Sequence, residues 1–251
     1  MLDCEREFAM KTIDIVIPVL NEETALLLCV DTLTNYLSQS IDRPWTISIV
    51  DNGSSDETLL IAQGIASNDK RIRVLSLPSK GRGRALKTAW MQSRADIVCY
   101  MDVDLSTRLV ALPPLLNAID DGYDIAIGSR LMPKSIVTRS FKRGIMSRVY
   151  NLLLRSIFGL KITDAQCGFK ALSKEAANRL VPLIENNNWF FDSELLITGY
   201  VNNHTIAEIP VEWVEDSDTS VKIIKTVTED LLGILRLKLT GIPRINYQQS
   251  T

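Results

Sequence analysis

Apolar and polar residues are distributed along the chain in a way that predicts strands alternating with helices. Nearly continuous apolar runs are typical of strands buried in a parallel sheet. Five such runs precede residue 130, at 13–19, 45–50, 71–77, 97–101 and 123–128. Apolar residues at helical spacing predict helices between them, including 22–38 and 85–93. The alternation predicts an α/β fold whose mostly parallel sheet gathers its loops at one edge.

The second half of the chain continues with mixed elements. The pattern predicts a turn and strand over 164–172, helices over 173–183 and from 189, a strand over 206–211 and a helix over 221–239. Ser173 is the expected N-cap of its helix, and Ser54 or Ser55 is expected to cap the helix that follows the second strand. His204 is interpreted as a surface residue. The last helix places these residues on one apolar face: Ile223, Ile224, Val227, Leu231, Ile234 and Leu235.

Length and composition favour one domain. The chain has 251 residues, 46% of them apolar, which is enough to bury a substantial core. We expect one domain over 12–240, an N-terminal extension over 1–11 and a flexible tail over 241–251. The net charge of −2 provides no basic field for nucleic acid. Four scattered cysteines and one histidine indicate neither zinc nor disulfides, and the lack of a signal peptide or apolar span predicts a cytoplasmic protein.

Two carboxylates follow the fourth strand. Asp102 and Asp104 are separated by one residue in the stretch IVCYMDVDLS. Two carboxylates at this spacing beyond a strand can both bind one divalent cation, and hard oxygen ligands suit Mg²⁺ or Mn²⁺. A lone Asp-x-Asp is also common as a solvated corner between strand and loop. The polar groups at neighbouring strand ends favour the metal site, because ligands of open α/β sheets bind along this edge.

Further candidate residues lie in other loops. Asp51 ends the second strand, and a loop with Lys80 and Gly81 opens a helix where backbone N–H groups can meet a phosphate. Asp192 and Glu194 follow aromatic residues in WFFDSELL, where a carboxylate can act as a base or orient a sugar hydroxyl. An alternative interpretation makes these two residues simple acids at a helix N-terminus.

Residues 130–163 contain no acidic side chain, although basic residues are interleaved with large apolar ones. A basic amphipathic stretch in a slightly acidic protein is typical of a surface that contacts anionic lipid. An ordinary core helix with a solvated basic face is the alternative. The absence of acids favours the membrane surface.

Taken together, these stretches resemble the family 2 inverting glycosyltransferases of GT-A fold, in particular the branch that makes polyprenyl-phosphate or dolichyl-phosphate sugars. The resemblance rests on IPVLNEE, VDNGSSDET, KGRGRALKTAW, YMDVDLS, GSR, DAQCGFK, WFFDSELL and EIPVEWVEDSDTSVKI, in that order. It covers most of residues 13–239 and implies a single Rossmann-like GT-A domain. DAQCGFK and WFFDSELL look more like the dolichyl-phosphate glucosyltransferases than the mannosyltransferases.

The resemblance also implies roles for individual residues. The base and ribose of a nucleotide-sugar donor would be held by Pro18, Leu20, Glu22, Val50, Asp51 and Asn52. Asp102 and Asp104 would bind the metal on its diphosphate, with Arg130 and Lys222 near the phosphates. Ser106 stands where relatives often have Gln, so a third direct metal ligand is not implied. The lack of an arginine near Asp216 favours UDP-glucose over GDP-mannose.

The implied reaction moves a hexose to the phosphate of a polyprenyl or dolichyl carrier, inverting the anomeric carbon. A phosphate acceptor is already anionic and needs no strong base, so Asp104 and Arg130 would act by neutralising charge. A hydroxyl acceptor would instead require Asp192 or Glu194 as a base. A non-catalytic nucleotide-sugar-binding protein and a nucleotidyltransferase are the remaining alternatives. Many relatives have C-terminal membrane spans, which this sequence lacks, so we expect membrane contact through residues 130–163, a membrane-protein partner or a homo-oligomer.

Overall fold

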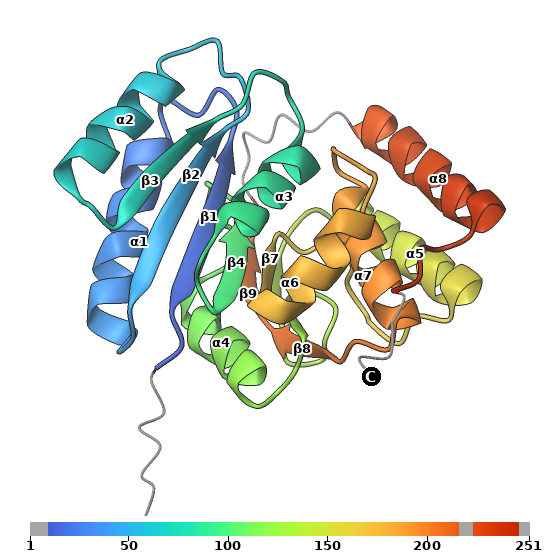
Figure 1. Ribbon diagram of the computed structural model, residues 1–251. Coiled ribbons are helices and arrows are strands. Elements are labelled where there is room, and N and C mark those ends of the chain that lie inside the picture. The colour runs from blue at the N-terminus through green and yellow to red at the C-terminus, as the bar shows by residue number, and fades with distance from the viewer. Residues whose placement is uncertain (1–9, 216–222, 246–251) are drawn as a thin grey trace, which may run out of the picture.

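The computed structural model describes residues 10–215 and 223–245. Its core is a seven-stranded sheet in the order β3-β2-β1-β4-β7-β5-β8 (Figure 1). The strands are β1 (Ile13–Val19), β2 (Trp45–Asp51), β3 (Ile72–Ser76), β4 (Ile97–Met101), β5 (Ile125–Ser129), β7 (Phe169–Ser173) and β8 (Ile206–Pro210). A separate two-stranded sheet pairs β6 (Ile136–Thr138) with β9 (Glu212–Val214). The expected α/β fold with a mostly parallel sheet is confirmed.

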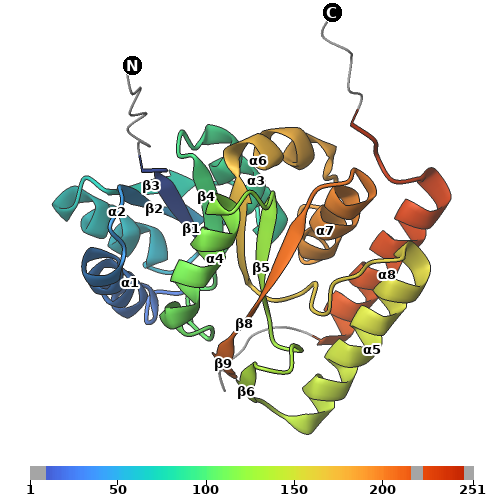
Figure 2. The same cartoon turned by 90° about the horizontal axis from the view of Figure 1, so that it is seen from below.

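Helices cover both faces of the sheet (Figures 1 and 2). They are α1 (Leu26–Ser40), α2 (Thr58–Asn68), α3 (Arg82–Gln92), α4 (Leu112–Asp120), α5 (Phe141–Phe158), α6 (Lys174–Leu180), α7 (Phe191–Val201) and α8 (Ile223–Thr240), with 3-10 turns η1 (Leu109–Ala111) and η2 (Val181–Leu183). One core cluster joins the sheet to α1, α2 and α4, and the other joins it to α3, α6 and α7. β1 and β4, in the middle of the sheet, are nearly continuous apolar runs because both of their faces are buried.

One strand runs against the others. β7 is antiparallel to both of its neighbours, β4 and β5. Its first residue, Phe169, pairs with Met101, the last residue of β4. The chain therefore enters the sheet beside the end of β4, and Gly168 lies against Asp102, whose carboxylate a side chain at position 168 would overlap. The apolar pattern of 169–173 predicts a strand but not its direction.

Three helix starts differ from the prediction. α1 begins at Leu26 rather than at Glu22, because residues 22–25 form a turn in which Ala25 N–H donates to the Glu22 carbonyl. α2 begins at Thr58, and neither Ser54 nor Ser55 caps it. Both serines instead hydrogen-bond to Asn21, which joins the loops after β1 and β2. α3 begins three residues earlier than predicted, since Ala85 N–H donates to the Gly81 carbonyl.

The end of the described chain is better anchored than expected. His204 is buried rather than exposed, with Nδ1 3.3 Å from a carboxylate oxygen of Asp124. The expected flexible tail is held as far as Ile245, because Asn202 donates to the Pro243 carbonyl and accepts from Ile245 N–H. Ser173 does cap α6, accepting from Ala176 N–H at 3.1 Å. No helix among the described residues is both long and apolar enough to cross a bilayer.

Substitution of Gly233 tests how α8 packs on the rest of the domain. A Cβ at this position would overlap the ring of Phe190, whereas a Cβ on Gly64 in α2 would meet nothing within 4 Å. We expect Gly233→Ala to lower the free energy of unfolding by about 1–3 kcal/mol through overpacking. The control Gly64→Ala should be neutral or stabilising by up to about 1 kcal/mol, as expected for an exposed helical glycine. Equal urea midpoints for the two variants would show that α8 does not pack here.

Candidate functional site

The carboxylate pair lies where β4 ends. Met101 is the last residue of β4, and the chain turns immediately, with Leu105 N–H donating to the Asp102 carbonyl at 3.2 Å. Leu105 takes a positive φ of 48°, and Asp104 accepts from Ser106 N–H at 2.9 Å. The Asp102 side chain is 38% exposed, and Asp104 is exposed. Both carboxylates can therefore be reached from solvent.

Asp102 forms an ion pair with Arg82, which the sequence analysis did not single out. Nη2 of Arg82 lies 2.6 Å from Oδ1 of Asp102. The guanidinium lies 5.2 Å from the ring centroid of Tyr100 and 4.8 Å from that of Trp189. Burial alone would lower the pKa of Arg82, but Asp102, Tyr100 and Asp192 raise it above its usual value. Arg82 is therefore a cation fixed at the first turn of α3.

Burial and two neighbouring carboxylates disfavour the ionised form of Asp102. Burial and the nearby charges of Asp104 and Asp192 raise the pKa of Asp102 to about 6, although Arg82 and Lys170 oppose the shift. The same carboxylates act on Cys29, whose pKa is raised to about 12 by burial and then by Asp104, Glu22 and Asp102. Glu22 thus lies in the same region as the pair. An added cation next to Asp102 and Asp104 would favour the ionised form of both carboxylates.

A second ion pair lies beneath the first. Lys170 is fully buried, and its Nζ donates to Asp192 Oδ1 at 2.6 Å and to the Cys167 carbonyl at 2.6 Å. Tyr100 also donates to Asp192, whose other oxygen lies 4.0 Å from Arg82 Nε. Asp192 is therefore brought to the site, but its charge is already balanced by Lys170.

Glu194 has other partners. Its carboxylate accepts from the backbone N–H groups of Glu185 and Asn186 at 3.1 and 2.9 Å. Arg236 of α8 lies 2.8 Å away. The side chain is fully buried, so these contacts fix the loop before α7 and hold α8 against it.

Arg130 is fixed by a third pair. Its backbone N–H, Nε and Nη2 donate to the carboxylate of Asp164 at 3.0, 2.7 and 2.9 Å. Burial alone would lower the pKa of Arg130, but Asp164 raises it, with smaller contributions from Cys167 and Asp102. The ring of Trp213 lies 5.4 Å from the guanidinium. Arg130 directly follows β5 and therefore lies at the same carboxyl edge of the sheet as the carboxylate pair.

The predicted donor residues lie at the ends of β1 and β2. Asp51 is buried and accepts from Gly53 and Ser54 N–H, so it shapes its own loop. Asn52 is also buried, and within the described chain its Oδ1 has no hydrogen-bond partner. That orphaned acceptor can bind a ligand's N–H or O–H group.

The remaining residues predicted to hold the donor differ in how far they are exposed to solvent. Pro18 and Leu20 are partly exposed beside this edge, whereas the Val50 side chain lies in the core. Lys80 is exposed, and Gly81 is packed so closely on Asn187 that a Cβ would lie 2.6 Å from its carbonyl oxygen. Lys222 lies outside the described residues.

The pair suits a hard divalent cation. Asp102 and Asp104 supply carboxylate oxygens, the ligands that Mg²⁺ and Mn²⁺ prefer. Among the described residues, no cluster of three His, Cys, Asp or Glu side chains has metal-binding geometry. A two-carboxylate site leaves coordination positions for water and for oxygens of a bound diphosphate, which is the usual arrangement for Mg²⁺.

A mostly parallel sheet with a carboxylate pair and buried arginines at its carboxyl edge is typical of α/β proteins that bind a ligand at this edge. The model of glycosyl transferase family 2 matches residues 14–181, about two thirds of the chain. The protein therefore belongs to the glycosyl transferase family 2.

Named relatives lie within this family. The chain is 37% identical over 245 residues to glycosyltransferase AglD of Haloferax volcanii, covering 93% of this chain and 38% of AglD. It is 30% identical over 253 residues to dolichyl-phosphate beta-glucosyltransferase of Homo sapiens, covering 94% of this chain and 78% of that protein. The chain thus spans less than half the length of AglD.

A solved structure shares the fold. Glucosyl-3-phosphoglycerate synthase from Mycobacterium tuberculosis, crystallised with Mn²⁺, UDP and phosphoglyceric acid, superimposes with a TM-score of 0.70 at 22% identity. The alignment covers 94% of this chain and 80% of that chain. At this identity the likeness concerns the fold, a single Rossmann-like GT-A domain.

Asp230 of α8 extends the buried polar region. It is 3% exposed, and Gln166 donates to its Oδ2 at 2.9 Å. Burial, followed by the charges of Glu229 and Asp192, raises the pKa of Asp230 to about 7. The folded state therefore holds a proton here between about pH 4 and 7 that the unfolded chain has lost.

We predict that the wild type loses stability relative to Asp230→Asn as pH rises from 5 to 8. The cause is that the folded wild type must give up this proton and bury a charged carboxylate. The raised pKa disfavours the ionised carboxylate in the folded state, and Asn carries no charge at either pH. The relative gain of the variant should be on the order of a few kcal/mol. Urea unfolding of both proteins at pH 5 and 8 measures it, and a pH-independent difference would contradict it.

Proposed function

We propose that the protein is a metal-dependent inverting hexosyltransferase that moves glucose from UDP-glucose to the phosphate of a polyprenyl or dolichyl carrier. One observation carries the proposal: the Asp102/Asp104 pair and the arginines Arg82 and Arg130 occupy the same sheet edge. The relative from Homo sapiens is named for dolichyl phosphate and glucose, and the solved synthase was also crystallised with UDP-glucose and Mn²⁺.

The donor side needs charge neutralisation. Asp102 and Asp104 are the residues that would hold Mg²⁺ or Mn²⁺, and the metal would stabilise the departing nucleoside diphosphate. Arg82 lies beside Asp102 and near two aromatic rings, and it supplies a second positive charge for the diphosphate. Asn52 offers its buried acceptor at the end of β2. For the donor residues Pro18, Leu20, Glu22, Asp51, Lys80, Gly81 and Lys222, contact with the nucleotide sugar is part of the proposal.

The acceptor side favours a phosphate. Arg130 is held by Asp164 and can position an anionic oxygen for in-line attack on the anomeric carbon. A hydroxyl acceptor would need a free base, but Asp192 is bound by Lys170 and Tyr100, and Glu194 by Arg236 and two backbone N–H groups. We therefore assign Asp192 and Glu194 to organising the site.

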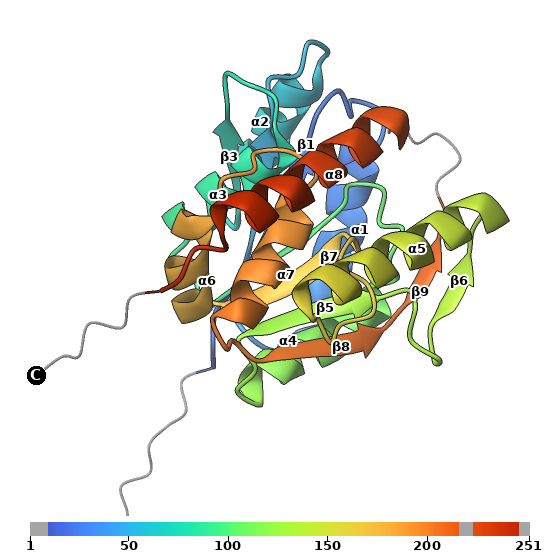
Figure 3. The ribbon, with the colours of Figure 1, turned by 90° about the vertical axis from the view of Figure 1, so that its right-hand side faces the viewer.

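Two helices supply a surface for a membrane. α5 and α8 lie on the same side of the molecule, opposite α1 and α2 (Figure 3). Their exposed apolar residues are Phe141, Ile145, Met146, Val149 and Leu152 on α5, and Val227, Leu231, Leu232, Leu235 and Leu239 on α8. Exposed basic side chains of α5, including Lys142, Arg148 and Arg155, flank this face. We propose that it contacts anionic lipid on the cytoplasmic side of a membrane.

Product analysis tests the reaction. Purified protein is incubated with labelled UDP-glucose, Mn²⁺ or Mg²⁺ and polyprenyl phosphate in detergent, with GDP-mannose in parallel. We expect organic-soluble label from UDP-glucose that disappears on chelation of the metal. Label from GDP-mannose alone would contradict the proposal that UDP-glucose is the donor. Donor binding without any organic-soluble label would overturn the lipid-phosphate acceptor.

Asp104→Ala should lower metal-dependent turnover by about 10²-fold or more, because it removes a group that fixes the charge opposite the diphosphate. The control is Asp42→Ala, which changes an exposed aspartate in the loop between α1 and β2 and should retain activity. Comparable turnover by the two variants would remove the metal-site assignment.

Charge introduced on α5 should weaken membrane binding. The double substitution Val149→Asp and Leu152→Asp places two carboxylates on the apolar face, and we expect at least about tenfold less protein on phosphatidylserine vesicles in a sedimentation assay. Leu28→Asp on α1 is the control, because Leu28 is 72% exposed and α1 lies on the side of the molecule away from α5 and α8 (Figure 1). If both proteins sediment equally, α5 is not the contact surface.

A further inference from the structure

We infer that Glu208 on β8 is a positioning residue that sets the orientation of Arg130 through the 163–164 backbone. The inference rests on the proposed role of Arg130 at the reacting phosphates. Glu208 has no contact with Arg130 itself among the bonds of the described residues. It acts through the loop that joins α5 to β7.

The Glu208 carboxylate gathers several donors of that loop. Thr163 N–H donates to its two oxygens at 2.9 and 3.0 Å, and the Thr163 hydroxyl donates to Oε1 at 2.6 Å. Asp164 N–H is 3.3 Å from the same oxygen. Thr163 also shares a hydrogen bond of 2.6 Å with Ser129, the residue before Arg130. Glu208 therefore fixes the backbone that carries Asp164.

Asp164 transmits this position to Arg130. Its side chain is fully buried and receives three hydrogen bonds from Arg130, two of them from the guanidinium in a bidentate arrangement. Such a pair is specific in geometry as well as strong. A shift of the Asp164 backbone must therefore move the guanidinium or break the pair.

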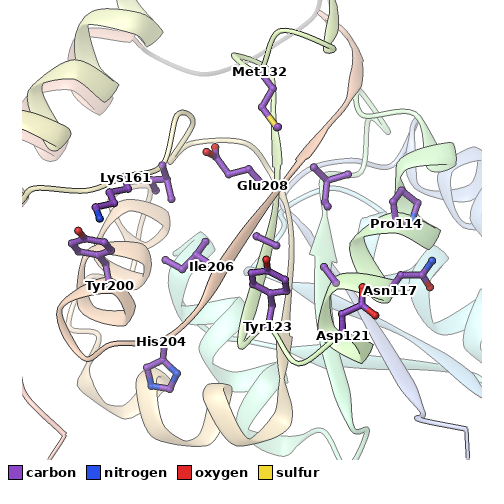
Figure 4. Close-up of a pocket in the computed structure, with 14 residues that line it drawn as sticks. Pro114, Asn117, Asp121, Tyr123, Met132, Lys161, Tyr200, His204, Ile206 and Glu208 are labelled. Carbon is purple, nitrogen blue, oxygen red and sulfur yellow. The ribbon is translucent and has the colours of Figure 1, made fainter.

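Glu208 lies on an edge strand, so the effect of its substitution on Arg130 can be distinguished from a direct effect on substrate or metal binding. β8 is the edge strand beyond β5, where Glu208 pairs with Ile127. Glu208 lines an outer cavity of about 790 Å³ with Lys161, Tyr200 and other residues (Figure 4). A substitution there changes no group that we assign to substrate or metal, so an effect on catalysis has to pass through the 163–164 loop.

Two substitutions separate positioning from folding. Glu208→Ala removes every acceptor, and Glu208→Gln keeps one carbonyl oxygen for Thr163. We expect Glu208→Ala to lower kcat/KM for polyprenyl phosphate by about tenfold or more, the scale of lost hydrogen bonds to a charged group. Glu208→Gln should recover most of that loss. Asp121→Asn, an exposed carboxylate in the same cavity, is the control and should retain wild-type kinetics.

A double-mutant cycle identifies the route. In an Arg130→Lys background the bidentate pair with Asp164 is already lost, so Glu208→Ala should lower kcat/KM by less than about twofold further. A full tenfold loss in that background would mean that Glu208 acts independently of Arg130 and would overturn the inference.

A crystal structure of Glu208→Ala gives a readout that does not depend on turnover. We expect the Arg130 guanidinium to leave its bidentate position on Asp164, while Lys170 remains on Asp192. An unchanged Arg130–Asp164 pair would overturn the inference. A wild-type protein that yields no lipid-linked sugar would instead overturn the proposed acceptor, so the two failures can be told apart.

Discussion

The structure depends on the balance of buried charge at the carboxyl edge of the sheet. Unpaired charges are too costly to bury, so a carboxylate that enters this region needs a cation in good geometry or, as for Asp51, backbone N–H donors. Three pairs meet this requirement: Asp102 with Arg82, Asp192 with Lys170, and Asp164 with Arg130. Their members come from the ends of strands and from helix starts that are distant in sequence. Asp192 links the two halves of the domain, because Tyr100 donates to one of its carboxylate oxygens and Arg82 lies 4.0 Å from the other.

The antiparallel strand β7 makes this arrangement possible. It enters the sheet between β4 and β5 and brings Lys170 beside Tyr100, its register partner on β4. Gly168 precedes β7 and leaves room for the Asp102 carboxylate. The fold thus places cations on both sides of the carboxylate pair, while Asp104 remains exposed. That remaining negative charge suits a divalent cation, and the surrounding arginines suit phosphates.

Much of this could be predicted from the sequence, because buried strands and the Asp-x-Asp corner are local patterns. The strands before residue 130 follow from apolar runs, and the placement of Asp51 and the Asp102/Asp104 pair at one edge follows from the edge rule for parallel sheets, whereas Arg130 was implied by the family resemblance alone. The direction of β7 could not be predicted, since pairing with β4 depends on contacts about 70 residues apart. The start of α1 was placed too early because a turn at residues 22–25 precedes the helix, and the start of α3 was placed too late because the helix already begins after Gly81.

The side-chain pairs between residues distant in sequence could not be predicted from the sequence either. In the sequence, Arg82 belongs to a basic loop and Lys170 is one charged residue in a strand. Their ion pairs with Asp102 and Asp192 are apparent only from the structure. Glu194 reads as a candidate base, but its hydrogen bonds assign it to the loop before α7. The motif DAQCGFK contains Asp164, Gln166, Gly168 and Lys170, so its dense set of polar and small residues was a usable signal.

The most direct test of this charge balance is anomalous scattering from Mn²⁺ in crystals grown with UDP. The account predicts one Mn²⁺ bound by carboxylate oxygens of Asp102 and Asp104, with Arg82 released from its ion pair with Asp102 and directed to the diphosphate. UDP bound without Mn²⁺ between these carboxylates, and with Arg82 still paired to Asp102, would contradict it.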